Sequence, residues 1–174
     1  DTLAEKLPGL TYAAGGGEAV RIAKEADVVL LCIGLDDVAE SEGMDRSTLA
    51  LPESHMALFE AVQEVNPNVV LVLSGGSPFA LPEGGFRAAI HGYLGGQAGA
   101  EAMAQTLLGE VNPSGRLAES WPYALEDTPC HRYYPAAGMY AQYREGLFVG
   151  YRYYDSAGVA VRYPFGYGLS YTKF

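Results

Sequence analysis

The chain has 174 residues, of which 49% are hydrophobic, and it contains 13 Tyr, one Trp and a formal net charge of −10. This length fits one domain with a core of its own. The negative charge argues against a nucleic-acid or anionic-membrane surface, because both require clustered Lys and Arg. No apolar run is long enough to cross a bilayer, and no signal peptide is visible. These features do not assign the protein to a cellular compartment. The start without a methionine indicates a processed or trimmed N-terminus.

The N-terminal part of the chain predicts two helices and a strand. Residues 1–7 have a helical pattern, although a parallel sheet usually begins with a strand, so we expect that a first strand is missing upstream. The glycine run at 15–17 predicts a flexible link, which is either a natural loop or the scar of a removed insertion. Residues 18–26 place apolar side chains on one helical face. The run DVVLLCIG at 27–34 then predicts a strand buried on both faces.

An acid-rich loop, AESEGMDR at 39–46, follows this strand and has no apolar repeat. A second helix is predicted at 52–66. Its first position suits Pro52, and Glu53 lies favourably at the positive end of the helix dipole.

The pattern of strand, loop and helix then repeats. NVVLVLSGG at 68–76 predicts a second buried strand, 87–96 a third, and 97–108 a helix that ends at Gly109. This rhythm predicts an α/β fold with a mostly parallel sheet and helices on both faces, an α/β sandwich. Ligands of such sheets bind beyond the carboxyl ends of the strands. The loops expected at that edge are 35–48, 74–84 and 94–98.

The chain becomes irregular and rich in Tyr and Gly from residue 112 onward. We expect turns up to 139, and then short strands and tight turns packed by tyrosine rings, with one short helix at 149–155 as the alternative. A carbohydrate-binding platform is the functional alternative for this tail. Its Gly and Pro content favours packing, and Trp121 is expected to have the same packing role.

Metal and disulfide chemistry have little support in the sequence. Cys32 lies in a predicted strand, where cysteine is usually a small buried hydrophobe, and a bond to Cys130 is disfavoured. The three histidines, His55, His91 and His131, do not have the spacing of metal ligands. We expect His55 to be exposed and His91 to be packed within its strand.

Four segments, in order and correctly spaced, resemble one family. They are ESEGMDRSTLALP, LSGGSPFALP, GYLGGQAGAEAMAQTLLGEVNPSGRLAESWP and EGLFVGYRYYDSAGVAVRYPFGYGLSYTKF. Together they are similar to the α/β-sandwich domain of glycoside hydrolase family 3, the β-glucosidase and β-xylosidase family, over residues 18–174. Within them, NPSGRL and PFGYGLSYTKF are specific to that domain.

The resemblance implies an active site shared by two domains. In this family a (β/α)8-type barrel supplies a nucleophilic aspartate, and the sandwich domain supplies a general acid/base. The family motif E-x-E-G-x-D-R matches Glu40, Glu42, Gly43, Asp45 and Arg46. The acid/base role falls on Glu42, the glutamate before the glycine, with Glu40 as the runner-up. Gly43, Asp45 and Arg46 are expected to shape the loop, the last two as an ion pair, with Arg46 also able to brace Glu42.

Further site residues follow the third predicted strand. Tyr93 and Gln97 are candidates for substrate binding, since an aromatic ring can stack on a sugar face. The family often has an aromatic pair at this place, and Tyr93 with Leu94 retains half of it. Packing is the alternative role for Tyr93.

The resemblance also implies what the chain does and what it requires. The expected function is that of one domain, residues 1–174, of a retaining, exo-acting β-glucosidase that cleaves β-glucosides or β-xylosides, without metal or organic cofactor. The expected partner is the barrel, which this chain lacks, so the chain alone is expected to be inactive. A fibronectin-III-like domain that follows the sandwich domain is a further expected partner.

Other interpretations remain for the same residues. Without the resemblance, Glu40 and Glu42 fit a solvated acidic loop, because most surface carboxylates do no chemistry. A non-catalytic carbohydrate-binding or interaction module on the same fold is the main rival. A flavodoxin-like nucleotide-binding domain ranks last, since no dinucleotide glycine fingerprint follows a strand and SGGSP at 74–78 lacks the lysine of a phosphate-binding loop.

Overall fold

The computed structural model describes residues 2–136 and 138–173; residues 1, 137 and 174, which the expected domain includes, lie outside the described residues. The chain forms two compact units. Unit 1 comprises the chain up to Asp45 together with Ala50–Ser77 and Leu81–Val111. Unit 2 comprises Arg46–Leu49, Pro78–Ala80 and the chain from Asn112 onward. Each unit is described by itself below.

Unit 1 is built on a parallel sheet of three strands, β1 (Val29–Gly34), β2 (Val69–Ser74) and β3 (Ala88–His91). The strands lie in the order β1-β2-β3, and Leu31 is paired with Leu71 in the register. β3 is shorter than the predicted strand. The predicted α/β fold with a parallel sheet is confirmed.

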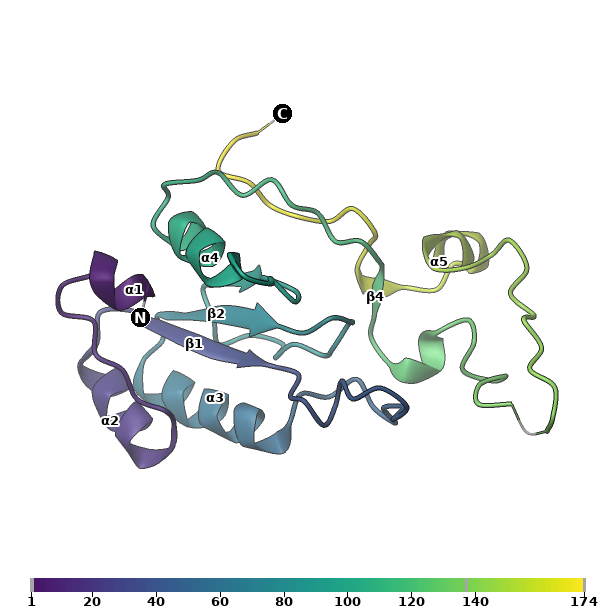
Figure 1. The fold of residues 1–174 in the computed structure, drawn as a ribbon, viewed down its shortest axis with the longest axis horizontal. Coiled ribbons are helices and arrows are strands. Elements are labelled where there is room, and N and C mark those ends of the chain that lie inside the picture. Colours follow the sequence, from purple (N-terminus) through teal and green to yellow (C-terminus); the bar gives the residue numbers. More distant parts are fainter. Residues whose placement is uncertain (1, 137, 174) are drawn as a thin grey trace. The chain divides into compact units, whose positions relative to one another are not determined.

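Four helices cover this sheet. Figure 1 shows α2 (Gly16–Glu25) and α3 (Glu53–Val65) on one side of it, and α1 (Thr2–Lys6) and α4 (Gly99–Leu107) on the other. α3 begins directly after Pro52, as the sequence predicts.

The core of unit 1 lies on one face of the sheet. Val69, Leu71 and Leu73 of β2 are buried there, and Val70 and Val72 between them are half-buried. Leu31 and Ile33 of β1 are buried, whereas Cys32 between them is exposed. The prediction that β1 is buried on both faces, with a buried Cys32, is therefore wrong. β1 is the first strand in the sheet order, whereas Met103 of α4 lies against Gly92, directly after β3, the strand at the other edge of the sheet.

The glycine run before α2 differs from the prediction. Gly16 and Gly17 belong to the first turn of α2, and Gly15 occupies the position before it with a φ of 144°. The three glycines therefore begin a helix rather than forming a flexible link. The high backbone freedom of glycine permits the entry at Gly15, which a side chain would strain.

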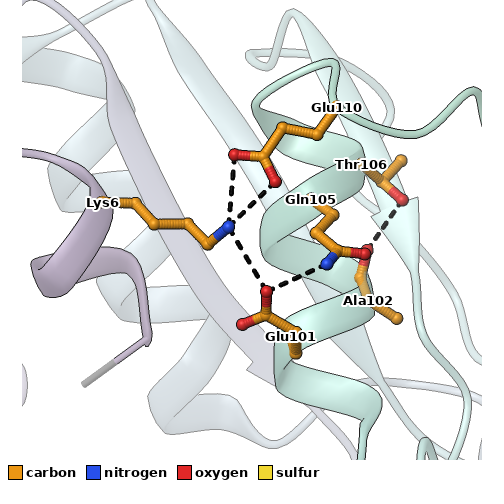
Figure 2. Close-up of polar contacts among 6 residues, drawn as sticks. All are labelled: Lys6, Glu101, Ala102, Gln105, Thr106 and Glu110. Atoms are coloured by element: carbon orange, nitrogen blue, oxygen red, sulfur yellow. Dashed lines mark hydrogen bonds and ion pairs between the residues drawn. The ribbon is translucent and has the colours of Figure 1, made fainter.

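A charged cluster joins the first helix of unit 1 to α4. Lys6 Nζ lies 2.9 Å from a carboxylate oxygen of Glu110 and 3.3 Å from Glu101 Oε1 (Figure 2). These two carboxylates raise the pKa of Lys6 above its ordinary value. The cluster fastens α1, which has no fully buried side chain of its own, beside α4.

Unit 2 contains a small antiparallel pair, β4 (Trp121–Pro122) with β5 (Val161–Tyr163), a 3-10 turn η1 (Leu125–Asp127) and the helix α5 (Tyr151–Ala157). The short helix that the sequence left as an alternative is therefore present. Trp121 has only 2% of its surface exposed, and its ring centroid lies 5.0 Å from that of Phe79 and 6.2 Å from that of Tyr163. The expected packing role of Trp121 is confirmed.

Both cysteines, Cys32 and Cys130, are free. Within residues 2–136 and 138–173, no helix has both the length and the hydropathy that crossing a membrane requires.

Candidate active site at the carboxyl edge of the sheet

The acid-rich loop begins at the end of β1, and backbone contacts hold its start. Leu35 N–H donates to the carbonyl oxygen of Ser74 at 3.0 Å, continuing the ladder between β1 and β2. His55 Nδ1 lies 2.9 Å from the carbonyl oxygen of Gly34. The expectation that His55 is exposed is therefore wrong: its ring is half-buried, because the first turn of α3 lies at the end of β1.

The loop itself consists of two tight turns. Asp36 Oδ1 accepts a hydrogen bond from Ala39 N–H at 2.8 Å, and Asp36 O accepts one from Glu40 N–H at 3.1 Å. Met44 N–H then donates to Ser41 O at 3.2 Å, which closes a four-residue turn. Gly43 occupies the third position of this turn with a φ of 79°, a value that glycine adopts without strain. The short acidic segment thus has a defined backbone path.

Glu40 connects this loop to the loop that follows β2. Its Oε1 accepts a hydrogen bond from Gly76 N–H at 2.7 Å and lies 3.4 Å from Ser77 Oγ. Glu40 is half-buried. A hydrogen bond from a backbone N–H to a carboxylate is stronger than one between neutral groups, so this contact is suited to holding the two loops together.

The loop that follows β3 joins the same cluster. Gly75 N–H donates to Tyr93 O at 3.3 Å, and the side chain of Leu94 lies over Gly76. Tyr93 has a φ of 49°, and it is the residue other than glycine with a positive φ among the described residues. Such a backbone conformation is uncommon for a bulky residue and is typical of functional or tightly constrained positions.

The ring of Tyr93 packs against His91 of β3, with 4.1 Å between the ring centroids. Burial lowers the pKa of His91, although a hydrogen bond with the Leu73 backbone and the nearby Glu40 carboxylate oppose that effect. His91 is half-buried in the strand, as expected. The contact with His91 supports the packing alternative for Tyr93.

Glu42 lies on the exposed turn between Glu40 and Gly43. Within the described residues its carboxylate has no hydrogen-bond or ion-pair partner, in contrast to Glu40. Gln97 and Asp45 are also exposed. The structure therefore brings Glu40 and the backbone of Tyr93 together through the 75–76 segment, and it leaves the carboxylate of Glu42 accessible.

Arg46 belongs to unit 2, where it is half-buried. Its guanidinium donates to the carbonyl oxygen of Pro78 at 2.9 Å. The same guanidinium partly offsets the effect of burial on Glu119, which raises the pKa of that carboxyl. No sequence pattern pointed to Glu119, because this residue stands alone in a turn-rich run and Arg46 is distant along the chain.

No group of three or more potential metal ligands occurs within residues 2–136 and 138–173. A hollow of about 500 Å³ lies in unit 2, and both charged and aromatic residues line it, among them Arg132, Arg144, Glu145, Phe148 and Tyr153.

Comparison with known proteins places these residues in a family. The profile of the glycosyl hydrolase family 3 C-terminal domain matches residues 2–171. The chain is 48% identical to thermostable beta-glucosidase B of Acetivibrio thermocellus over 158 residues, which covers 90% of this chain and 21% of the relative. It is 45% identical to an exo-alpha-(1->6)-L-arabinopyranosidase of Bifidobacterium longum over 191 residues, which covers all of this chain and 25% of the relative.

A solved structure of a member of the same family is also similar to this chain. The beta-glucosidase of glycoside hydrolase family 3 from Bifidobacterium adolescentis matches with a TM-score of 0.88 and 43% identity, over 98% of this chain and 27% of that one. The chain therefore spans about a fifth to a quarter of the length of these relatives. Their remaining length contains further domains.

Proposed function

Because this chain belongs to glycosyl hydrolase family 3, as its C-terminal domain, we propose that it completes the active site of a retaining, exo-acting β-glycosidase. A β-glucosidase is the preferred form of this proposal, since that is the name of the thermostable relative and of the solved structure from Bifidobacterium adolescentis. The substrate is then a β-glucoside, or a β-xyloside, cleaved at its non-reducing end. A (β/α)8 barrel outside this chain carries the nucleophilic aspartate.

Glu42 is the general acid/base in this proposal. The observation that supports it most is the position of Glu42, on the loop that leaves the carboxyl end of β1, at the edge where parallel sheets bind ligands. Its carboxylate is exposed and unpaired within the described residues, so it is accessible to a group outside this chain. Glu40 is engaged by Gly76 and is less suited to exchange protons with a substrate.

The chemistry requires two carboxyl groups on opposite sides of the scissile bond, about 5–5.5 Å apart. The aspartate of the barrel attacks the anomeric carbon, while protonated Glu42 gives its proton to the departing oxygen. A covalent glycosyl–enzyme results. Glu42, now ionised, removes a proton from water as that water attacks the anomeric carbon and releases the sugar with retention.

The test is a domain exchange in which this chain replaces the matching part of the thermostable relative. We expect the exchanged protein to hydrolyse aryl β-glucosides and the 174-residue chain alone to be inactive. Glu42→Gln should lower kcat/KM for phenyl β-glucoside by about 10²–10⁴, the usual contribution of general acid catalysis, and should spare 2,4-dinitrophenyl β-glucoside, whose leaving group needs no proton.

Asp37→Asn is the matched control, because Asp37 is an exposed carboxylate on the same loop. Its kinetics should equal those of the unmodified protein. Equal kinetics for Glu42→Gln in a folded, active exchange protein would remove Glu42 from the mechanism. A folded exchange protein without activity would instead favour a non-catalytic module.

A further inference from the structure

We infer that Glu40 is a positioning residue, which fixes the loop of Glu42 against the loops that follow β2 and β3. This inference deepens the proposed function and rests on it. It assigns to the two glutamates of the motif different tasks: Glu42 transfers protons, and Glu40 holds the backbone from which Glu42 projects.

The first observation is the anchor itself. Glu40 Oε1 accepts the Gly76 N–H at 2.7 Å and lies 3.4 Å from Ser77 Oγ, so one carboxylate oxygen faces two donors of the loop after β2. Glu40 and Gly76 are 36 residues apart, and the contact therefore links two loops whose strands are neighbours in the sheet. Hydrogen bonds to a charged acceptor are stronger than neutral ones.

The second observation is the tight space around Gly76. A Cβ added at this residue would lie 3.1 Å from Leu94 Cδ1 and 3.2 Å from Glu40 Oε1, closer than ordinary packing contacts. Glycine at 76 thus lets both the Glu40 carboxylate and the Leu94 side chain approach the backbone closely.

The third observation is that the anchored segment continues to β3. Gly75 N–H donates to Tyr93 O at 3.3 Å, and Tyr93 has the positive φ of 49°. Contacts at 75 and 76 therefore join three loops into one support. Only Ser41 separates Glu40 from Glu42 along the chain, so a shift of Glu40 moves Glu42 directly.

The anchor is expected to affect how precisely Glu42 is positioned, and not whether Glu42 can transfer a proton. A displacement of about 1 Å at a catalytic group can lower the rate by roughly 10²-fold. Glu42 acts as the acid in the first step, which limits turnover with a poor leaving group, and as the base in the second step, which limits turnover with a good one. Loss of the anchor should therefore reduce kcat for good and poor leaving groups alike. It should leave the shape of the pH profile unchanged, because the group that titrates in the reaction is still present.

The experiment compares Glu40→Ala and Glu40→Gln in the exchanged protein. Glu40→Ala should lower kcat by about 10–100-fold, equally for phenyl and 2,4-dinitrophenyl β-glucosides. Glu40→Gln keeps an oxygen that can accept the Gly76 N–H, and it should restore activity to within about tenfold of the unmodified protein. Asp37→Ala is the control for loss of a carboxylate on this loop.

Hydrogen exchange of the segment around Gly76 supplies a second readout that does not depend on turnover. Glu40→Ala should speed exchange there, and Glu40→Gln should do so less. Unchanged exchange and unchanged kcat in Glu40→Ala would overturn the inference. So would a Glu40→Gln variant that fails only on poor leaving groups, because that result would make Glu40 the proton donor.

The two hypotheses can fail separately. If Glu42→Gln shows the expected dependence on leaving group and Glu40→Ala changes neither kcat nor hydrogen exchange, the inference on Glu40 is wrong and the proposed function stands. If Glu42→Gln also leaves kcat/KM unchanged, the proposed function fails.

Discussion

Different interactions stabilise the structure within each of the two units of this chain. In unit 1, the loops that follow the strands are fixed by hydrogen bonds to backbone groups, such as the Gly76 N–H that donates to Glu40. In unit 2, contacts between aromatic rings have this role. Trp121 packs against Phe79 and Tyr163, and Tyr163 also packs against Tyr167 with 4.9 Å between the ring centroids. Polar contacts define a direction and a distance at a site, whereas ring packing mainly stabilises.

This difference has a consequence for substitutions in each unit. Removal of a ring in unit 2 should cost stability, whereas removal of a polar anchor in unit 1 should cost positional precision with less effect on unfolding. Backbone crowding in unit 1 is the exception, because the strands approach each other closely at Gly34 and Ser74. Trp121→Ala in unit 2 and Gly34→Ala in unit 1 test these expectations.

Trp121→Ala should be the most destabilising substitution. Trp121 is 2% exposed and contacts two other rings, and truncation of a buried Trp typically costs about 3–5 kcal/mol. Hydrogen exchange should show this loss in the amides of β4 and β5, and a smaller change in β1 and β2. Tyr143→Ser is the control, because Tyr143 is 95% exposed and its loss should change the free energy of unfolding by less than about 0.5 kcal/mol. An equal loss of protection in both units would contradict their separate organisation.

Gly34→Ala should destabilise unit 1. An added Cβ would overlap the carbonyl oxygen of Ser74, which is backbone and cannot rotate away. We expect a loss of about 1–3 kcal/mol, the usual cost of overpacking, measured by hydrogen exchange in β1 and β2.

Gly17→Ala is the matched control for that substitution. Gly17 lies within α2, and an added Cβ would meet nothing within 4 Å. The same change should therefore stabilise unit 1 by up to about 1 kcal/mol, since Ala favours a helix more than Gly does. A loss of stability from Gly17→Ala, or none from Gly34→Ala, would contradict the open space at Gly17 or the close backbone contact at Gly34.

The sequence predicted those features that depend on local pattern. The apolar face of α3 and the start of that helix after Pro52 follow from residues within one segment. The parallel sheet follows from the alternation of buried strands with helices. The places of Glu40 and Glu42 at its carboxyl edge follow in turn from the topology.

Features that depend on distant neighbours could not be predicted in this way. The exposure of Cys32 depends on which helices cover β1, and the half-buried position of His55 depends on the end of β1, 21 residues away. The partner of Glu40 is likewise 36 residues distant. For Gly15–17, the sequence correctly indicated unusual backbone freedom, but that freedom serves the start of α2 rather than a link.

The most direct test of the central claim is azide rescue of Glu42→Ala in the exchanged protein, with 2,4-dinitrophenyl β-glucoside as substrate. Without the general base, the glycosyl–enzyme should persist, and azide, which needs no deprotonation, should attack it. We expect a large rise in turnover with azide and the formation of β-glucosyl azide for Glu42→Ala, and no such product for Glu40→Ala. Turnover of Glu42→Ala that is insensitive to azide, or rescue of Glu40→Ala alone, would contradict it.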